Sequence, residues 1–388
     1  MKKKLALLLA VCFVLSMVLS ACGDSNSEAS NSVNSNPVSS SNSEENPGNT
    51  DELPHYDIGI LPWSLTDTEI VRLMDYFDNY IGPALNLTFH WVASTTDETL
   101  ITNIETLIQT GCDAIMPFYV TASVVEVCTQ NEVYFAQFCA NISGETLEAA
   151  EASPYWLGNC HEDDTAAGLA MVESLYNQGA RNFAIIGIPA GQQPIGDARF
   201  QAFADGVATL QARDSSVQLL GEYRGLESVD AVENFLNLYP ELDGIANACG
   251  GGGRNEAIVQ ILETTGAAGR VKYGAINAVE EYDYWYGADA LHFMVCGQHP
   301  DAVFTLMLVY NALRGTPLSD APVYMTMNYL YVVPDNEADY SNYIMGDTFP
   351  YTMDELKQFI KVFNADATAD DLAAAVASYS IEEVASRR

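Results

Sequence analysis

Basic residues are scarce in this sequence. Its 388 residues include 16 lysines and arginines against 52 aspartates and glutamates, so the formal net charge is −36 at pH 7. A field of this sign repels the phosphates of nucleic acids and the head groups of anionic lipids. The composition therefore argues against a nucleic-acid-binding protein and favours a soluble, monomeric protein that works at a surface.

Motifs for metal binding and for hydrolysis are also absent from the sequence. The eight cysteines show no CxxC spacing, and neither GxSxG nor HExxH occurs. Zinc sites need clustered ligand pairs, and a lone adjacent pair such as Cys160 and His161 is weak support for nucleophilic catalysis. We therefore expect a protein that is not an enzyme and that holds no metal and no cofactor.

The later cysteines show no pattern of pairing. Several lie inside apolar, strand-like runs, where a free thiol behaves as a small hydrophobic side chain. We expect buried free thiols, with disulfides as the alternative for an exported protein. The residues concerned are Cys112, Cys128, Cys139, Cys160, Cys249 and Cys296.

The longest apolar run, residues 5–19, is too short for a spanning helix. It follows lysines 2–4 and ends at the small residues Ser20 and Ala21, as a secretory signal does. The stretch LSACG around Cys22 resembles the lipobox of bacterial lipoproteins, in which the signal is cut before the cysteine and the cysteine then receives acyl chains such as palmitate. We interpret residues 1–21 as a signal peptide and Cys22 as the lipidation site. The alternative is an ordinary secretory signal with an incidental cysteine.

The segment after Cys22 is almost free of apolar residues. Ser, Asn, Glu, Pro and Gly dominate up to Pro54. Such a composition cannot offset the chain entropy lost on folding, so we expect residues 22–54 to form a disordered tether. A lipid and a tether together predict a globular part held at the extracytoplasmic face of the cell membrane, anchored to it and not spanning it.

From residue 56 onward, short β-rich runs alternate with helical patterns. The first series starts with a strand at 56–61 and a helix at 67–81, and a second series starts with a helix at 166–179 and ends with a strand at 271–277. Strands interleaved with helices of this length predict βαβ units and parallel sheets, and two series predict two doubly wound lobes. Ligands of such sheets bind at the carboxyl ends of the strands.

Three stretches carry a resemblance to a known family: GCDAIMPFY at 111–119, the long stretch from DDTAAGLAM to FADGV at 163–207, and FMVCGQHPDAVFTLMLVYNALRGTPL at 293–318. Their order and spacing resemble the type I periplasmic binding proteins, in the sugar-binding branch with the ribose- and galactose-binding proteins. The resemblance covers most of residues 56–335. It implies an α/β fold of two Rossmann-like lobes, joined by three hinge strands, with the ligand between them.

The resemblance also implies a division of the chain. The N-terminal lobe would consist of residues 55–161 and 298–325, and the C-terminal lobe of 162–297 and 326–350. Residues 351–388 would form a helical tail, which starts at a capping box of Thr352 and Glu355.

Polar ligand residues follow from the resemblance position by position. Arg199 matches a family arginine, whose planar fork of donors suits vicinal hydroxyls. Gln298 matches the hinge glutamine, which can donate and accept. Asp163 matches the aspartate of the first hinge, where Asp164 would serve nearly as well. The alternatives are a surface arginine at 199 and a glutamine at 298 that binds only backbone.

Two predicted ligand residues depart from the sugar-binding pattern. Asn277 ends a strand where sugar binders usually carry aspartate, and Asn141 lies near another position where the family often has aspartate. A carboxylate accepts two strong hydrogen bonds from sugar hydroxyls, whereas an amide accepts fewer and can also donate. The departures point away from a plain aldose.

Aromatic side chains usually sandwich a sugar ring, because the C–H face of the ring is apolar. Trp63, in the loop after the first strand, and Tyr119 are the predicted candidates, although simple packing explains each equally well. Tyr282 and Trp285 are further candidates that could equally belong to a surface turn.

The stretch CGGGGR at 249–254 is the largest departure from the family. A glycine-rich turn before a helix exposes backbone N–H groups, so it could hold an anion beside Arg254. It lacks the GxxxxGK[ST] pattern of a nucleotide-binding loop. A flexible loop is the favoured alternative.

Together these features predict the substrate-binding lipoprotein of an ABC importer. It would bind a sugar or sugar-like small molecule by hinge closure and dock on a membrane permease. The alternative is an extracytoplasmic sensor that presents a signal molecule to a membrane kinase or chemoreceptor.

Overall fold

The computed structural model describes residues 53–388, which form one compact unit. The predicted signal peptide, the lipidation site at Cys22 and the tether up to residue 52 lie outside the described residues. No helix in residues 53–388 combines the length and the apolar character that crossing a bilayer requires.

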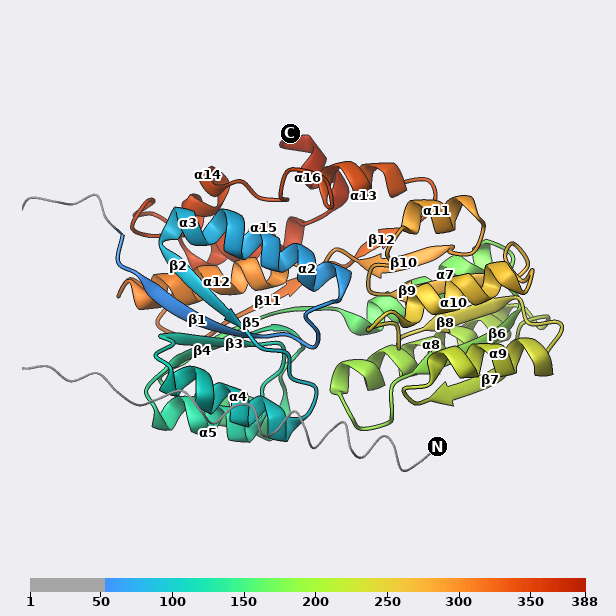
Figure 1. The fold of residues 1–388 in the computed structure, drawn as a ribbon, viewed down its shortest axis with the longest axis horizontal. Coiled ribbons are helices and arrows are strands. Elements are labelled where there is room, and N and C mark those ends of the chain that lie inside the picture. Colours follow the sequence, from blue (N-terminus) through green and yellow to red (C-terminus); the bar gives the residue numbers. More distant parts are fainter. Residues whose placement is uncertain (1–52) are drawn as a thin grey trace, which may run out of the picture. The chain divides into compact units, whose positions relative to one another are not determined.

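The first of two six-stranded sheets has the order β11-β5-β4-β3-β1-β2, and all its strand pairs are parallel. Its strands are β1 (Tyr56–Leu61), β2 (Leu87–Trp91), β3 (Ala114–Pro117), β4 (Tyr134–Cys139), β5 (Trp156–Glu162) and β11 (Val323–Met327). Helices cover both faces of this sheet (Figure 1). One face carries α4 (Asp97–Gln109), α5 (Ala122–Gln130) and α6 (Gly144–Glu151), and the other carries α2 (Thr68–Asp75), α3 (Gly82–Leu85) and α12 (Pro300–Leu313).

The second sheet has the order β12-β10-β9-β8-β6-β7, and only β12 runs antiparallel to its neighbour. Its strands are β6 (Asn182–Gly187), β7 (Gln218–Arg224), β8 (Gly244–Asn247), β9 (Lys272–Ile276), β10 (Phe293–Cys296) and β12 (Leu330–Val332). One face carries α7 (Asp164–Asn177) and α8 (Pro194–Arg213), and the other carries α9 (Ser228–Leu238) and α10 (Arg254–Thr264). A short helix, α11 (Tyr282–Gly287), connects β9 to β10.

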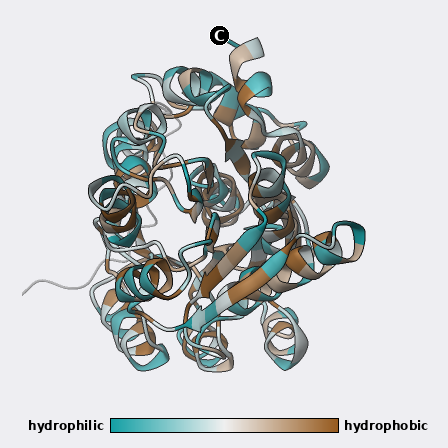
Figure 2. Cartoon of the chain, turned by 90° about the vertical axis from the view of Figure 1, so that its right-hand side faces the viewer, coloured by the Kyte–Doolittle hydropathy of each residue, from teal (hydrophilic) through white to brown (hydrophobic). Residues whose placement is uncertain are grey.

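The central strands are apolar along their length because helices bury both of their faces. In β6 the consecutive residues Phe183, Ala184, Ile185 and Ile186 are all fully buried. Figure 2 shows the same division, with brown strands inside and teal on the outer faces of the helices. The predicted α/β fold with two parallel sheets is therefore confirmed.

Three connections join the two sheets. The chain leaves the first sheet between β5 and α7, returns between β10 and α12, and crosses again between β11 and β12. In the last crossing only Asn328 and Tyr329 separate strands that belong to different sheets.

The predicted helix at 67–81 is divided in the structure. Asp67 caps α2, a π-helix follows at Tyr76–Ile81, and the segment ends at α3 before Asn86, which has a left-handed φ of 56°. In the wider π turn the consecutive residues Tyr76 and Phe77 are both fully buried. Tyr76 also donates a hydrogen bond to the backbone oxygen of Tyr351, so the π-helix binds the C-terminal segment.

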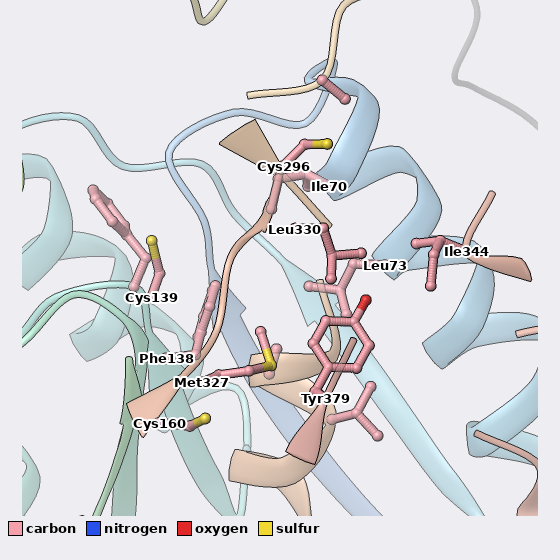
Figure 3. Packing of buried hydrophobic residues seen from close by; sticks show 14 of the residues in the cluster. Ile70, Leu73, Phe138, Cys139, Cys160, Cys296, Met327, Leu330, Ile344 and Tyr379 are labelled. Carbon is pink, nitrogen blue, oxygen red and sulfur yellow. The ribbon is translucent and has the colours of Figure 1, made fainter. Parts of the chain in front are cut away.

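The C-terminal segment is packed onto the rest of the protein (Figure 1). It contains α13 (Glu337–Tyr343), α14 (Met353–Leu356), the 3-10 helix Lys357–Phe359, α15 (Ala369–Ser378) and α16 (Ile381–Ser386). The predicted capping box of Thr352 and Glu355 is present at α14. Figure 3 shows Tyr379 in one apolar cluster with Leu73 and Leu330, which belong to α2 and β12.

The cysteines of the described part are all free and buried, as predicted. Burial raises the pKa of Cys139, Cys160 and Cys296 well above the usual thiol range, so these thiols stay protonated and unreactive.

Candidate functional site

A cleft of about 530 Å³ lies where the strands of both sheets end. Its wall includes Trp63 after β1, Phe118 after β3 and Cys139 at the end of β4. The second sheet contributes Ile188 after β6 and Asn277 after β9. Carboxyl ends of parallel strands are the usual ligand sites of such folds, so this cleft is the candidate site.

The structure brings four of the predicted ligand residues together. Trp63, Arg199, Asn277 and Gln298 all line the cleft. The Trp63 ring packs edge-on against Phe118, with ring centroids 5.9 Å apart, so it forms a firm apolar wall.

The other predicted residues lie in adjoining hollows. Tyr119 and Asn141 line one of about 260 Å³, and Asn141 and Asp163 line another of about 410 Å³. Tyr119 donates a hydrogen bond of 2.8 Å to Asp97, and Asp163 caps α7 by accepting from the Ala166 N–H. Their roles in binding stay predictions.

Neither Tyr282 nor Trp285 is among the residues that line the cleft. Both belong to α11, where Tyr282 hydrogen-bonds Ser341 of α13 and packs against Tyr340. Tyr282 packs with the C-terminal segment, whereas Trp285 packs edge-on against Tyr284. Local sequence could not distinguish such packing from a place in the cleft.

Arg199 is fixed in the cleft by a buried ion pair. Its Nε donates to Asp164 Oδ1 at 2.7 Å and its Nη2 donates to the Tyr329 hydroxyl at 2.6 Å, while Tyr329 in turn donates to Asp164. Burial lowers the pKa of Arg199, but the Asp164 carboxylate and the neighbouring Tyr329 and Cys139 together raise this pKa above its usual value. Nη1 has no partner among residues 53–388, so it is available to a ligand.

A chain of polar side chains joins the two sides of the cleft. Asn277 Nδ2 donates to Asp67 Oδ2 at 3.1 Å, and Gln298 Nε2 donates to Asn277 Oδ1 at 3.4 Å. Asn277 has a left-handed φ of 74°, a conformation in which asparagine is enriched. Gln298 Oε1 is buried and has no partner within the described part of the chain, so it can accept from a ligand hydroxyl.

Asp67, which the sequence did not predict, lies beside the cleft and contacts one of its residues. Burial raises its pKa to about 6, against the hydrogen bond from Asn277 that lowers it. Its position before an apolar helix marks it as an N-cap, and it does accept from the Glu69 N–H at 3.1 Å. No local sequence pattern predicts its second contact, with Asn277 of the other lobe.

The glycine-rich stretch forms one wall of the cleft. Gly250, Gly251 and Gly252 line it, and a Cβ on Gly250 would collide with Asn255. Arg254 Nε donates to Leu226 O at 2.9 Å and its Nη1 donates to Gly251 O, so the loop is held in place.

A buried group of possible metal ligands lies beside the cleft. Ligand atoms of Cys139, Glu162 and Asp301 are within 4.8 Å of one another. Burial, and then the neighbouring Asp301 carboxyl, raise the pKa of Glu162 well above its usual value. Asp301 accepts from the Ala302 N–H, whereas neither oxygen of Glu162 has a hydrogen-bond partner among the described residues. The arrangement suits a carboxyl pair that keeps one proton on Glu162.

No family model matches the sequence, and no curated protein matches it. Solved structures do match its fold. An ABC transporter solute-binding protein from Actinobacillus succinogenes with bound D-allose is 14% identical, with a TM-score of 0.62, and the match covers 74% of this chain and 100% of that one.

Two other solved structures bind a polyol. A solute-binding protein from Bacillus halodurans with bound myo-inositol is 16% identical, with a TM-score of 0.59, covering 75% of this chain and 99% of that one. A Caulobacter myo-inositol-binding protein is 13% identical, with a TM-score of 0.60, covering 74% and 96%. The chain therefore has the two-lobed α/β fold of type I periplasmic binding proteins, to which its sequence motifs pointed.

Proposed function

We propose that this chain is the substrate-binding lipoprotein of an ABC importer and that it binds a sugar or sugar-like molecule. The observation that carries the proposal is the cleft of about 530 Å³, in which Trp63, Arg199, Asn277 and Gln298 meet. An apolar ring wall beside donors and acceptors matches the two faces of a sugar ring. The neighbours with bound D-allose and myo-inositol support the same ligand class.

The proposed mechanism is hinge closure. Trp63 and Asp67 belong to the first lobe and Arg199 and Asn277 to the second, so a ligand that touches both sides favours the closed state. The closed form would dock on the permease and release the ligand unchanged, without catalysis.

Ligand binding is tested by thermal unfolding of residues 53–388 with pentoses, hexoses and polyols. A ligand that binds only the folded state raises the melting temperature by mass action. Gln298→Ala should remove the shift, whereas Gln358→Ala, at an exposed position of the C-terminal segment, should keep it. Absence of a shift with every compound at millimolar concentration, and with sugar acids and sugar phosphates as well, would contradict the proposal.

Membrane anchoring is tested in the full chain. If Cys22 carries the lipid, Cys22→Ala should move the protein from the membrane fraction to the soluble fraction, because the hydrophobic anchor is lost. Cys112→Ala is the matched control, since this thiol is buried in the globular part. A Cys22→Ala protein that stays in the membrane fraction would overturn the anchor.

A further inference from the structure

The charge on the wall of the cleft is opposite to that of the molecule. Acidic residues outnumber basic ones 52 to 16 in the sequence. Yet the only charged side chains among the residues that line the cleft are Arg199 and Arg254. A wall that carries cations in a strongly acidic protein favours an anionic ligand group.

The two arginines are not equivalent. Arg199 is neutralised by Asp164 at 2.7 Å. Arg254 forms no ion pair with any residue in 53–388; its Nε and Nη1 bind the carbonyls of Leu226 and Gly251, and Nη2 has no partner there. Arg254 is therefore the uncompensated cation of the cleft.

Backbone donors lie beside Arg254. The N–H groups of Gly250, Gly251 and Gly252 donate to no residue of the described part, and Gly250 is buried. A buried N–H group without a partner is rare in native proteins, so an acceptor from a ligand is expected at Gly250, whereas Gly251 and Gly252 are partly or fully exposed. The loop precedes α10, whose N-terminus adds a favourable field for an anion.

A second, independent feature of the same cleft selects hydroxyl groups. Gln298 is 2% exposed and its Oε1 has no partner among the described residues. This oxygen accepts a hydrogen bond, so it recognises a donor such as a sugar hydroxyl and not the anionic group.

The carboxyl of Asp67 lies close to the loop. A Cβ on Gly251 would lie 4.0 Å from Asp67 Oδ2, which already accepts from Asn277 Nδ2. Burial raises the pKa of Asp67 to about 6, so this carboxyl is mostly ionised at pH 7 but takes up a proton more readily than an ordinary carboxylate when an anion lies beside it. Asp67 therefore opposes an anion less than an ordinary carboxylate would.

We infer that the ligand is a sugar with an anionic group, a carboxylate or a phosphate, which sits on residues 250–252 and Arg254 while its hydroxyls reach Gln298. The inference rests on the proposed function and narrows its ligand class. The neighbours described above hold uncharged ligands, so the glycine loop and Arg254 would distinguish this chain from them.

The test is titration calorimetry of residues 53–388 with D-glucuronate, D-glucose 6-phosphate and D-glucose, which share one ring. At least one anionic compound should bind more than about tenfold tighter than D-glucose, since a hydrogen bond to a charged group contributes about 1.5–3 kcal/mol. Whichever anion binds identifies carboxylate or phosphate as the group. Its affinity should fall as salt is added.

Arg254→Gln should weaken binding of the anion about 10- to 100-fold and change binding of D-glucose little. Ser228→Ala is the control for a general loosening of the loop. It removes the hydrogen bond of 3.0 Å from the Ser228 hydroxyl to Cys249 O and leaves every charge in place. It should affect anionic and neutral sugars equally.

Tighter binding of D-glucose, or equal losses for both ligands with Arg254→Gln, would overturn this inference and leave the proposed function standing. If none of these three compounds binds and none of the wider set of sugars and polyols shifts the melting temperature, both this inference and the proposed function are overturned.

Discussion

Arg199 combines a buried ion pair with an Nη1 that has no partner within residues 53–388, in one side chain that lines the cleft. Its ion pair with Asp164 is almost fully buried, with side-chain exposures of 9% and 7%. Removal of one partner of such a pair leaves an uncompensated buried charge, which is far more costly than loss of a surface pair.

Asp164→Asn should therefore lower the free energy of unfolding by about 3 kcal/mol or more. The adjacent Asp163→Asn is a matched control, because Asp163 is exposed and asparagine caps a helix as well as aspartate does. Its effect should stay within about 0.5 kcal/mol. Urea unfolding of the two variants measures both changes in the free energy of unfolding. Equal losses would show that the buried ion pair stabilises the fold no more than the exposed Asp163 does.

Glu162 makes stability depend on pH. Its pKa is raised in the folded state, so the folded protein keeps a proton that the unfolded chain releases above about pH 4.3. The contribution of this proton to the free energy of unfolding is complete below the pKa of Glu162 in the unfolded chain. It is lost as the pH rises toward the pKa of Glu162 in the folded protein, by about 1.4 kcal/mol per pH unit. The charged neighbours are Asp301, Asp164 and Arg199.

Glu162→Gln should raise the melting temperature at pH 7 to 8 and should have little effect near pH 4. The amide is neutral at every pH, so no buried carboxyl at position 162 has to ionise as the pH rises. Melting curves across this range provide the measurement. A variant destabilised equally at both ends of the range would contradict a protonated Glu162.

At the scale of elements, the C-terminal segment is part of the core. Leu372 of α15 is fully buried, and Tyr379, which follows α15, donates a hydrogen bond of 2.8 Å to the backbone oxygen of Gly297 in the second crossing. Asn328, in the third crossing, donates to Ala377 O at 3.1 Å. The segment therefore contacts two of the connections between the lobes.

Leu372→Ala should lower the free energy of unfolding by about 2–5 kcal/mol, because it opens a cavity in this core. Val362→Ala, at a side chain that is 38% exposed, should cost far less. A single shifted transition in calorimetry is expected. Two separate transitions, with only the smaller one shifted, would show that the C-terminal segment folds independently.

At the scale of the whole molecule, a buried node joins lobes, crossing and C-terminal segment. Glu69 of α2 accepts from the Gly297 N–H at 2.8 Å, from His299 Nδ1 at 2.8 Å and from the Tyr340 hydroxyl at 3.0 Å. Burial raises the pKa of Glu69, but His299 together with the hydrogen bonds from Gly297 and Tyr340 lowers this pKa overall. If the lobes close on a ligand as proposed, this buried node would stay in place as the pivot.

Ligand that raises the melting temperature should also reduce the radius of gyration, because closure brings the lobes together. Small-angle X-ray scattering with and without ligand measures this change. Gln298→Ala at the same ligand concentration is the control and should keep the larger radius. A bound protein with an unchanged radius would contradict hinge closure.

The local patterns of the sequence predicted much of the fold. The strand at Tyr56–Leu61, the capping box of Thr352 and Glu355 and the buried thiols all follow from short-range signals. Periodicity and capping act within a few residues, so a single sequence displays them directly. The same signals, with the family motifs, pointed to Trp63, Arg199, Asn277 and Gln298, which the cleft brings together.

Only the tertiary structure decided what depends on residues far apart in the chain. Asp67 contacts the cleft residue Asn277 of the other lobe, and the π-helix residue Tyr76 binds the backbone of Tyr351. The separation of β11 and β12 into different sheets follows from no local pattern, and only the family resemblance placed a change of lobe near it. The sequence by itself determined which segments form strands and helices, because those choices are local. The structure decided which side chains meet, because packing between lobes depends on contacts that no short stretch of sequence contains.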